Sequence, residues 1–129
     1  MKNALKTVTA IAVLLAAWGL AEAGQIFTPV LYIDTDFEAF FCAAANVGST
    51  PIIVKVEFVR FDGTVPCSFE FNPIQPGHHT GIACFEEGNG QCKFSTPPYN
   101  VAGSIPSVRA NICAIVTEGV SARVCADAR

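Results

Sequence analysis

The chain has 129 residues, of which 51% are hydrophobic, and a formal net charge of −3 at pH 7. This length suits one domain with one core. Binding to nucleic acids or to anionic membranes relies on basic patches, and eight basic residues against eleven acidic ones give little support to either. We therefore expect no nucleic-acid partner.

Residues 1–23 have the parts of a secretory signal peptide. Two lysines give a positive start, residues 8–20 (VTAIAVLLAAWGL) form a short apolar run, and Ala21-Glu22-Ala23 places small residues where signal peptidase cuts. The rival interpretation is a membrane anchor, but crossing a bilayer needs about 20 apolar residues. We expect cleavage after Ala23, a periplasmic or extracellular domain over residues 24–129, and no membrane insertion after cleavage.

The first segments of the mature chain are β-prone, with one ambiguity. Residues 25–33 (QIFTPVLYI) predict an edge strand with a break, because Pro29 cannot donate a ladder hydrogen bond. Residues 37–47 (FEAFFCAAANV) have helical spacing of the phenylalanines and a capping-box pattern at their start. Their direct connection to the next segment favours a strand instead, and the residues alone leave both interpretations open.

Residues 52–59 (IIVKVEFV) are the clearest strand in the sequence. Ile52, Val54, Val56 and Phe58 share one face, and the other face is mixed. Asp62-Gly63 then predicts a tight hairpin turn, with a second strand over residues 67–71.

The later segments continue the β pattern. Residues 72–79 (NPIQPGHH) predict a loop, and residues 96–106 (TPPYNVAGSIP) a longer loop that crosses between sheets. Between them, residues 80–85 and 91–95 predict a hairpin. Residues 107–117 (SVRANICAIVT) alternate clearly, and residues 121–126 are expected to pair back onto them. About seven or eight strands at this spacing indicate an antiparallel β-sandwich.

One stretch resembles a known group of domains. The run C-A-A-A-N-V-G-S-T-P-I-I-V-K-V-E-F, followed by Asp62-Gly63 and Ile74-Gln75-Pro76-Gly77, is similar to small secreted bacterial Ig-like β-sandwich domains, including those related to bacterial cell adhesion. The resemblance covers residues 40–77. It implies an Ig-like fold, a strand over residues 37–47 and an extracellular setting, and it brings no catalytic residues. The cysteine pattern is not a general feature of those domains.

All six cysteines follow the leader, which indicates disulfides in an oxidising compartment. No C-x-x-C pair occurs, so a zinc site is disfavoured. Cys84 and Cys92 lie at equal distances from Gly88 in a predicted turn, and Cys113 and Cys125 lie at equal distances from Gly119. This spacing predicts the bridges Cys84–Cys92 and Cys113–Cys125, which leaves Cys42 with Cys67. The alternative is an Ig-like Cys42–Cys113 bridge, with Cys67 joined to Cys125.

The sequence contains no recognisable set of catalytic residues. The histidines are an adjacent pair, His78-His79, in a predicted loop, and no nucleophile motif or phosphate-binding loop occurs. We expect no enzyme and no cofactor. Two neighbouring imidazoles without a third ligand make a weak chelate, so we also expect no tight metal site. Tyr99 and Asn100 are candidate contact residues in the crossing loop, although Tyr99 could equally plug one end of the sandwich.

Together these features predict a non-enzymatic, disulfide-bonded domain of the cell envelope or its exterior. We expect it to bind a protein or a surface glycan through loops. One alternative is a structural subunit of a surface assembly, joined by strand addition along residues 25–33. Another is a weak metal-handling protein that uses His78-His79.

Overall fold

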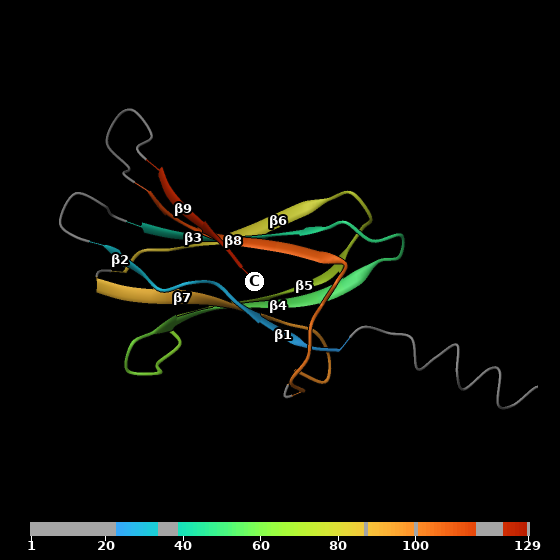
Figure 1. The fold of residues 1–129 in the computed structure, drawn as a ribbon, viewed down its shortest axis with the longest axis horizontal. Helices are drawn as coiled ribbons and strands as arrows, with labels where there is room; N and C mark the ends of the chain where they lie inside the picture. Colours follow the sequence, from blue (N-terminus) through green and yellow to red (C-terminus); the bar gives the residue numbers. More distant parts are fainter. Residues whose placement is uncertain (1–22, 34–38, 87, 100, 116–122, 129) are drawn as a thin grey trace, which may run out of the picture.

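The computed structural model describes residues 23–33, 39–86, 88–99, 101–115 and 123–128 (Figure 1). Nine strands and no helix lie within these ranges. They are β1 (Gln25–Phe27), β2 (Leu31–Ile33), β3 (Ala39–Asn46), β4 (Ile52–Arg60), β5 (Cys67–Ile74), β6 (His79–Cys84), β7 (Gly88–Ser95), β8 (Val108–Ile115) and β9 (Arg123–Asp127).

The strands form two antiparallel sheets that pack as layers (Figure 1). The first sheet has the order β1-β7-β4-β5, with β2 also paired to β7, and the second has the order β6-β3-β8-β9. The loop after β7 therefore crosses from one sheet to the other, as predicted. The prediction of an all-β antiparallel sandwich is confirmed, with nine strands rather than seven or eight.

The β4–β5 hairpin forms as its alternation predicts. Val54, Val56 and Phe58 are fully buried and pair in register with residues of β5. Gly63 has a positive φ of 83°, a backbone conformation that glycine adopts without a steric penalty. β5 is longer than the strand predicted over residues 67–71. It extends to Ile74, into the stretch predicted as a loop.

The break predicted around Pro29 is also present. β1 and β2 pair with the same strand, β7, but residues 28–30 leave the ladder between them. Thr28 closes the gap: its hydroxyl accepts a hydrogen bond from the Cys92 amide at 2.8 Å, and its own amide donates to the Cys92 carbonyl at 3.0 Å.

The helical interpretation of residues 37–47 is wrong where the structure describes them. β3 pairs with β6 on one side and β8 on the other, so its backbone groups find partners in two neighbouring strands. Phe40, Cys42 and Ala44 face the core. Long-range pairing overrides the local helical spacing here, while residues 37 and 38 lie outside the described residues.

The hairpin predicted between residues 80–85 and 91–95 is wrong. β6 pairs with β3 in the second sheet, whereas β7 pairs with β4 in the first. The short segment after Cys84 thus crosses between the sheets. Asn89-Gly90, a turn signal in the sequence, lies inside β7.

The disulfide pairing follows from these strand positions. The bridges are Cys42–Cys92, Cys67–Cys84 and Cys113–Cys125, with Cα–Cα distances of 5.8, 6.0 and 4.1 Å. The Cys113–Cys125 prediction is confirmed. The Cys84–Cys92 and Cys42–Cys67 pairings are wrong, because they assumed that β6 and β7 face each other in one hairpin. The Ig-like alternative, Cys42–Cys113, is also wrong, because the two residues lie on neighbouring strands of one sheet and point to opposite faces.

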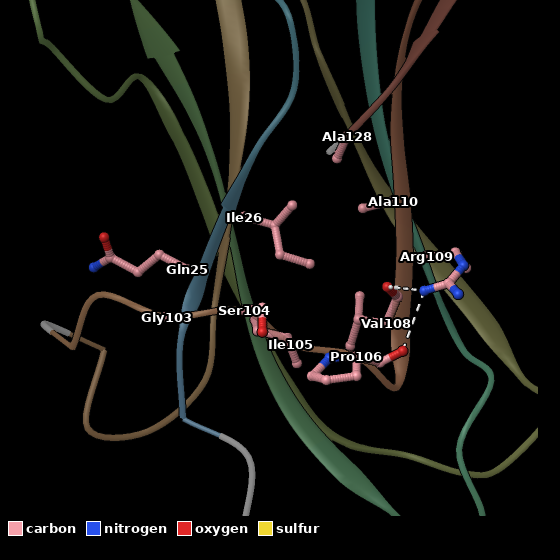
Figure 2. Close-up of a pocket in the computed structure, with 10 residues that line it drawn as sticks. All are labelled: Gln25, Ile26, Gly103, Ser104, Ile105, Pro106, Val108, Arg109, Ala110 and Ala128. Atoms are coloured by element: carbon pink, nitrogen blue, oxygen red, sulfur yellow. Dashed lines mark hydrogen bonds between the residues drawn. The ribbon is translucent and has the colours of Figure 1, made fainter.

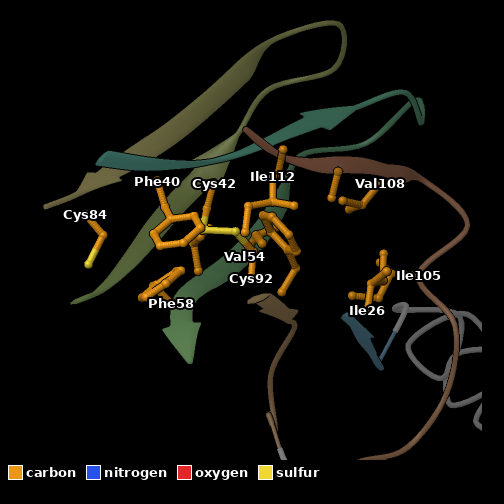
Figure 3. Packing of buried hydrophobic residues seen from close by; sticks show 14 of the residues in the cluster. Ile26, Phe40, Cys42, Val54, Phe58, Cys84, Cys92, Ile105, Val108 and Ile112 are labelled. Carbon is orange, nitrogen blue, oxygen red and sulfur yellow. A yellow bond between two sulfur atoms is a disulfide. The ribbon is translucent and has the colours of Figure 1, made fainter. Parts of the chain in front are cut away.

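The Cys42–Cys92 bridge crosses the centre of the core (Figure 3). Beside it the rings of Phe40 and Phe58, one from each sheet, stack with centroids 4.5 Å apart. At one edge of the core Asn46 is fully buried. Its side-chain amide donates to the carbonyls of Thr50 and Ile74 at 2.8 and 2.9 Å, which ties the β3–β4 connection to the end of β5.

Candidate functional site

Large apolar side chains stand out from two connections at the same end of the sandwich. Phe61, in the β4–β5 turn, is 89% exposed, and Phe85, which follows β6, is 73% exposed. Val65 in the same turn is also exposed. Figure 1 shows both connections at one end of the two layers. We call Phe61, Val65 and Phe85 the aromatic end.

Two links hold these connections together. The Cys67–Cys84 disulfide joins the first residue of β5 to the last residue of β6, and so lies directly behind both connections. In front of it, the Arg60 guanidinium donates to the Glu86 carboxylate. This hydrogen bond raises the pKa of Arg60. The two connections therefore behave as one unit.

The β4–β5 turn is also ordered within itself. The Asp62 carboxylate accepts hydrogen bonds from the Thr64 amide at 2.9 Å and the Thr64 hydroxyl at 2.6 Å. These bonds stabilise the ionised form and lower the pKa of Asp62. An aspartate that bonds to backbone two residues ahead is a common way to fix a turn, and here it orders the turn next to Phe61.

The sequence patterns do not predict the aromatic end. Phe61 lies next to the predicted Asp62-Gly63 turn, and Phe85 lies within the strand predicted over residues 80–85. A usable signal was present for Phe61. A phenylalanine next to a tight turn, beyond the last alternating position of the strand, has no core face to occupy.

Tyr99 does not plug an end of the sandwich, and its role as a contact residue stays a prediction. It lies half-buried on the outer face of the first sheet, where its hydroxyl donates to the Glu70 carboxylate and Lys55 Nζ stands 5.6 Å from the ring centroid. Its carbonyl accepts from the Gln25 side-chain amide. These contacts anchor the crossing loop to the sheet. Asn100 lies outside the described residues.

The contact with Glu70 changes the pKa of the Tyr99 hydroxyl, which can be measured. The hydrogen bond to Glu70 raises the pKa of Tyr99 to about 12, because the bond and the nearby negative charge both disfavour a phenolate. Because the pKa of Tyr99 is raised in the folded state, the Tyr99–Glu70 hydrogen bond stabilises the fold fully below the ordinary tyrosine pKa of about 10. This contribution to stability is lost as the pH rises through the folded-state pKa of about 12.

We expect Glu70→Ala to lower the pKa of Tyr99 towards 10. Ultraviolet titration of phenolate absorbance in a Tyr32→Phe background would isolate Tyr99 and measure the change. An identical titration curve with and without Glu70 would contradict the contact.

The histidine pair borders a groove rather than a metal cluster. His78 and His79 are both exposed, and no group of three or more metal-ligating side chains occurs among the described residues. With residues of β5 they line a groove of about 420 Å³ between the edge strands of the two sheets. The expectation of no tight metal site stays a prediction.

A second groove, of about 490 Å³, opens between β1 and β8 on the opposite side of the sandwich (Figure 2). Ile26, Ile105 and Val108 in its wall belong to the core. On its rim the Arg109 guanidinium is turned onto the carbonyls of Pro106 and Val108, at 3.1 and 3.4 Å. This groove brings no convergent polar side chains together and is the open side of the core.

Comparison with known proteins supports the fold alone. No family model matches the sequence, and no curated protein does. Among solved structures, the crystal structure of Thermotoga maritima 1070 is similar, with a TM-score of 0.53 and 14% sequence identity over 83% of this chain and 93% of that one. Within the described residues, no helix is long and apolar enough to cross a membrane.

Proposed function

We propose that this protein is a secreted or periplasmic, non-enzymatic binding domain whose aromatic end contacts another protein. The observation that carries the proposal is the exposure of Phe61 and Phe85 on two connections that a disulfide and an ion pair join. Exposed apolar clusters rimmed by polar residues are typical of interaction surfaces, and phenylalanine is enriched where proteins bind proteins.

The order of the two connections adds to this proposal. Binding costs free energy when loops must be ordered at the interface. The Cys67–Cys84 bridge and the Asp62–Thr64 hydrogen bonds have already removed much of that freedom. A surface prepared in this way favours a specific partner.

The chemistry of the aromatic end favours a protein over a glycan. Phenylalanine has no polar group of its own, and hydroxyl-rich ligands need hydrogen-bonding partners beside an aromatic ring. The charged side chains beside it that the structure describes are already hydrogen-bonded, Arg60 with Glu86 and Asp62 with Thr64. An apolar or aromatic protein surface needs no such partners.

The proposed compartment is supported by the disulfides and the leader-like start. Three bridges suit an oxidising environment. The expected first residue of the mature chain is held in the fold. Gly24 is buried, its amide donates to the Thr96 hydroxyl at 3.0 Å, and its carbonyl accepts from the Thr96 amide at 3.1 Å. A Cβ atom at position 24 would lie 2.7 Å from the Gly103 carbonyl oxygen.

We expect the protein isolated from its native cell envelope to begin at Gly24. Intact-mass analysis would measure this directly. Because Trp18 is the single tryptophan of the sequence, cleavage also leaves tyrosine as the main source of fluorescence. Retention of residues 1–23 in the isolated protein would contradict the proposed processing.

We also propose that the sandwich is a variant of the Ig-like fold. In Ig domains the second and sixth strands lie in opposite sheets and carry the inter-sheet bridge. Here β3 and β7 occupy the equivalent positions and carry Cys42–Cys92. The neighbours of these two strands differ from those in Ig domains. β8 lies beside β3, where Ig domains place their first strand, and β1 lies beside β7, where Ig domains place their last strand.

The aromatic end is tested by replacing Phe61 and Phe85 with serine in one variant. The control variant, Phe27→Ser with Val47→Ser, changes two exposed apolar residues elsewhere. After chemical cross-linking in the native envelope, we expect the partner bands of the wild type to persist in the control and to fall at least tenfold in the Phe61/Phe85 variant. Equal bands in both variants would overturn the proposal.

Strand addition along residues 25–33 gains less support. β1 and β2 have three residues each and are separated by a break, and short edge strands resist pairing with other chains. Size-exclusion chromatography would still test it, since a monomer disfavours an assembly subunit.

A further inference from the structure

We propose that the groove between β5 and β6 binds a small neutral saccharide. The groove has a volume of about 420 Å³ and is lined by Phe69, Phe71, Gln75, His78, His79 and Thr80, together with parts of neighbouring β5 residues. This volume lies within the range of small-molecule sites. The groove is separate from the aromatic end, so the proposal does not depend on the function proposed above.

An uncovered aromatic ring is the first argument. Phe69 pairs in register with Val56, and Phe71 with Val54, so both phenylalanines are on the core-facing side of the first sheet. Val54 and Val56 are fully buried, yet Phe69 remains 54% exposed. The rings of Phe69 and Phe71 lie against each other with centroids 4.6 Å apart. An inward-facing aromatic pair is thus left open at the side of the sandwich.

The ends of the groove argue for a compact ligand. Beyond one end, past Phe69 and outside the lining residues, the Cys67–Cys84 disulfide links β5 to β6. At the other end the chain turns through residues 75–78, where the His78 amide donates to the Gln75 carbonyl at 3.0 Å. Both closures are covalent connections of the chain. They leave space for a small molecule and obstruct an extended peptide running the length of the groove.

The polar wall argues for a hydroxyl-rich ligand. Gln75 and Thr80 each supply a donor and an acceptor, and a neutral imidazole does the same. A pyranose matches this arrangement, because one ring face is apolar and its edge carries hydroxyl groups. Among the described residues that line the groove there is no lysine or arginine, so an acidic sugar would find no strongly basic partner there.

Nuclear magnetic resonance titration of the full oxidised protein tests the proposal. The probes are N-acetylglucosamine, cellotriose and maltotriose, with zinc chloride and the dipeptide Phe-Gly in parallel. We expect at least one saccharide to give saturable shifts of amide signals in residues 69–80. Phe69→Ala should weaken that binding at least tenfold, while the control Phe27→Ala, an exposed phenylalanine on another face, leaves it unchanged. Retained signal dispersion in both variants shows that they fold.

Several outcomes would overturn the inference. They are the absence of saccharide shifts, shifts that persist in Phe69→Ala, and binding of Phe-Gly alone. Stoichiometric zinc binding that His78→Ala abolishes would assign the groove to a metal instead. Cross-linking of the partner at the aromatic end should be unaffected by Phe69→Ala, which separates failure of this proposal from failure of the proposed function.

Discussion

Replacing Cys42 and Cys92 together by alanine should destabilise the domain more than removing either other bridge. The two cysteines are 50 residues apart, and closing a loop of that length lowers the entropy of the unfolded chain enough to stabilise by about 4 kcal/mol. Both side chains are fully buried, so their loss also leaves a cavity in the core. Domains of this size are commonly stable by about 5–15 kcal/mol.

The matched control removes Cys113 and Cys125 in the same way. That bridge spans 12 residues within one strand pair, and the same relation predicts about 3 kcal/mol. Urea unfolding of both double variants, followed by circular dichroism, would measure the difference. A smaller loss for Cys42/Cys92 than for Cys113/Cys125 would contradict the expectation that the bridge at the centre of the core contributes more stability.

Gly90→Ala should have the next largest effect, although it adds only one methyl group. A Cβ atom at position 90 would lie 1.9 Å from Cζ of Phe58 and 2.4 Å from its Cε2. Phe58 is fully buried and stacked on Phe40, so its ring has no space to retreat. The backbone is held as well, because Gly90 pairs with Leu31 on one side and Arg60 on the other. We expect a loss of about 3 kcal/mol, at the upper end for overpacked cores.

A second substitution separates steric conflict from the general cost of alanine in this strand. Phe58→Leu shortens the side chain that the new methyl group meets. We expect Gly90→Ala with Phe58→Leu to lose clearly less stability than the sum of the two single changes, as residues in direct contact do. Additive losses in thermal or urea unfolding would show that the conflict with the Phe58 ring is not the cause.

The strands were predictable where a single sheet face was marked by alternation. Val54, Val56 and Phe58 identify β4, and Val108, Ala110, Ile112 and Ala114 identify β8. Pro29 predicted the break between β1 and β2. These features depend on near neighbours in the chain, and so they can be read without knowing which strands meet.

The candidate surfaces were not predictable in the same way. Phe85 follows a strand that the sequence placed in a hairpin, and Phe69 alternates like any core residue. Only the position of β5 and β6 at the edges of different sheets shows that Phe69 lacks a cover and that Phe85 stands beside the β4–β5 turn. Tyr99 likewise gained its contacts from Glu70 and Lys55, which are remote in sequence.

By itself the sequence predicted that the chain is all-β and where most strands lie, and it offered Cys113–Cys125 across a local strand pair as one of two pairings. Tertiary structure alone decided the other two bridges. Cys84 and Cys92 are close in sequence but lie in different sheets, because β6 pairs with β3 and β7 with β4. The alternation of apolar residues indicates which face of each strand is buried. The choice of partner strand depends on packing between residues far apart in the chain, which no local pattern contains.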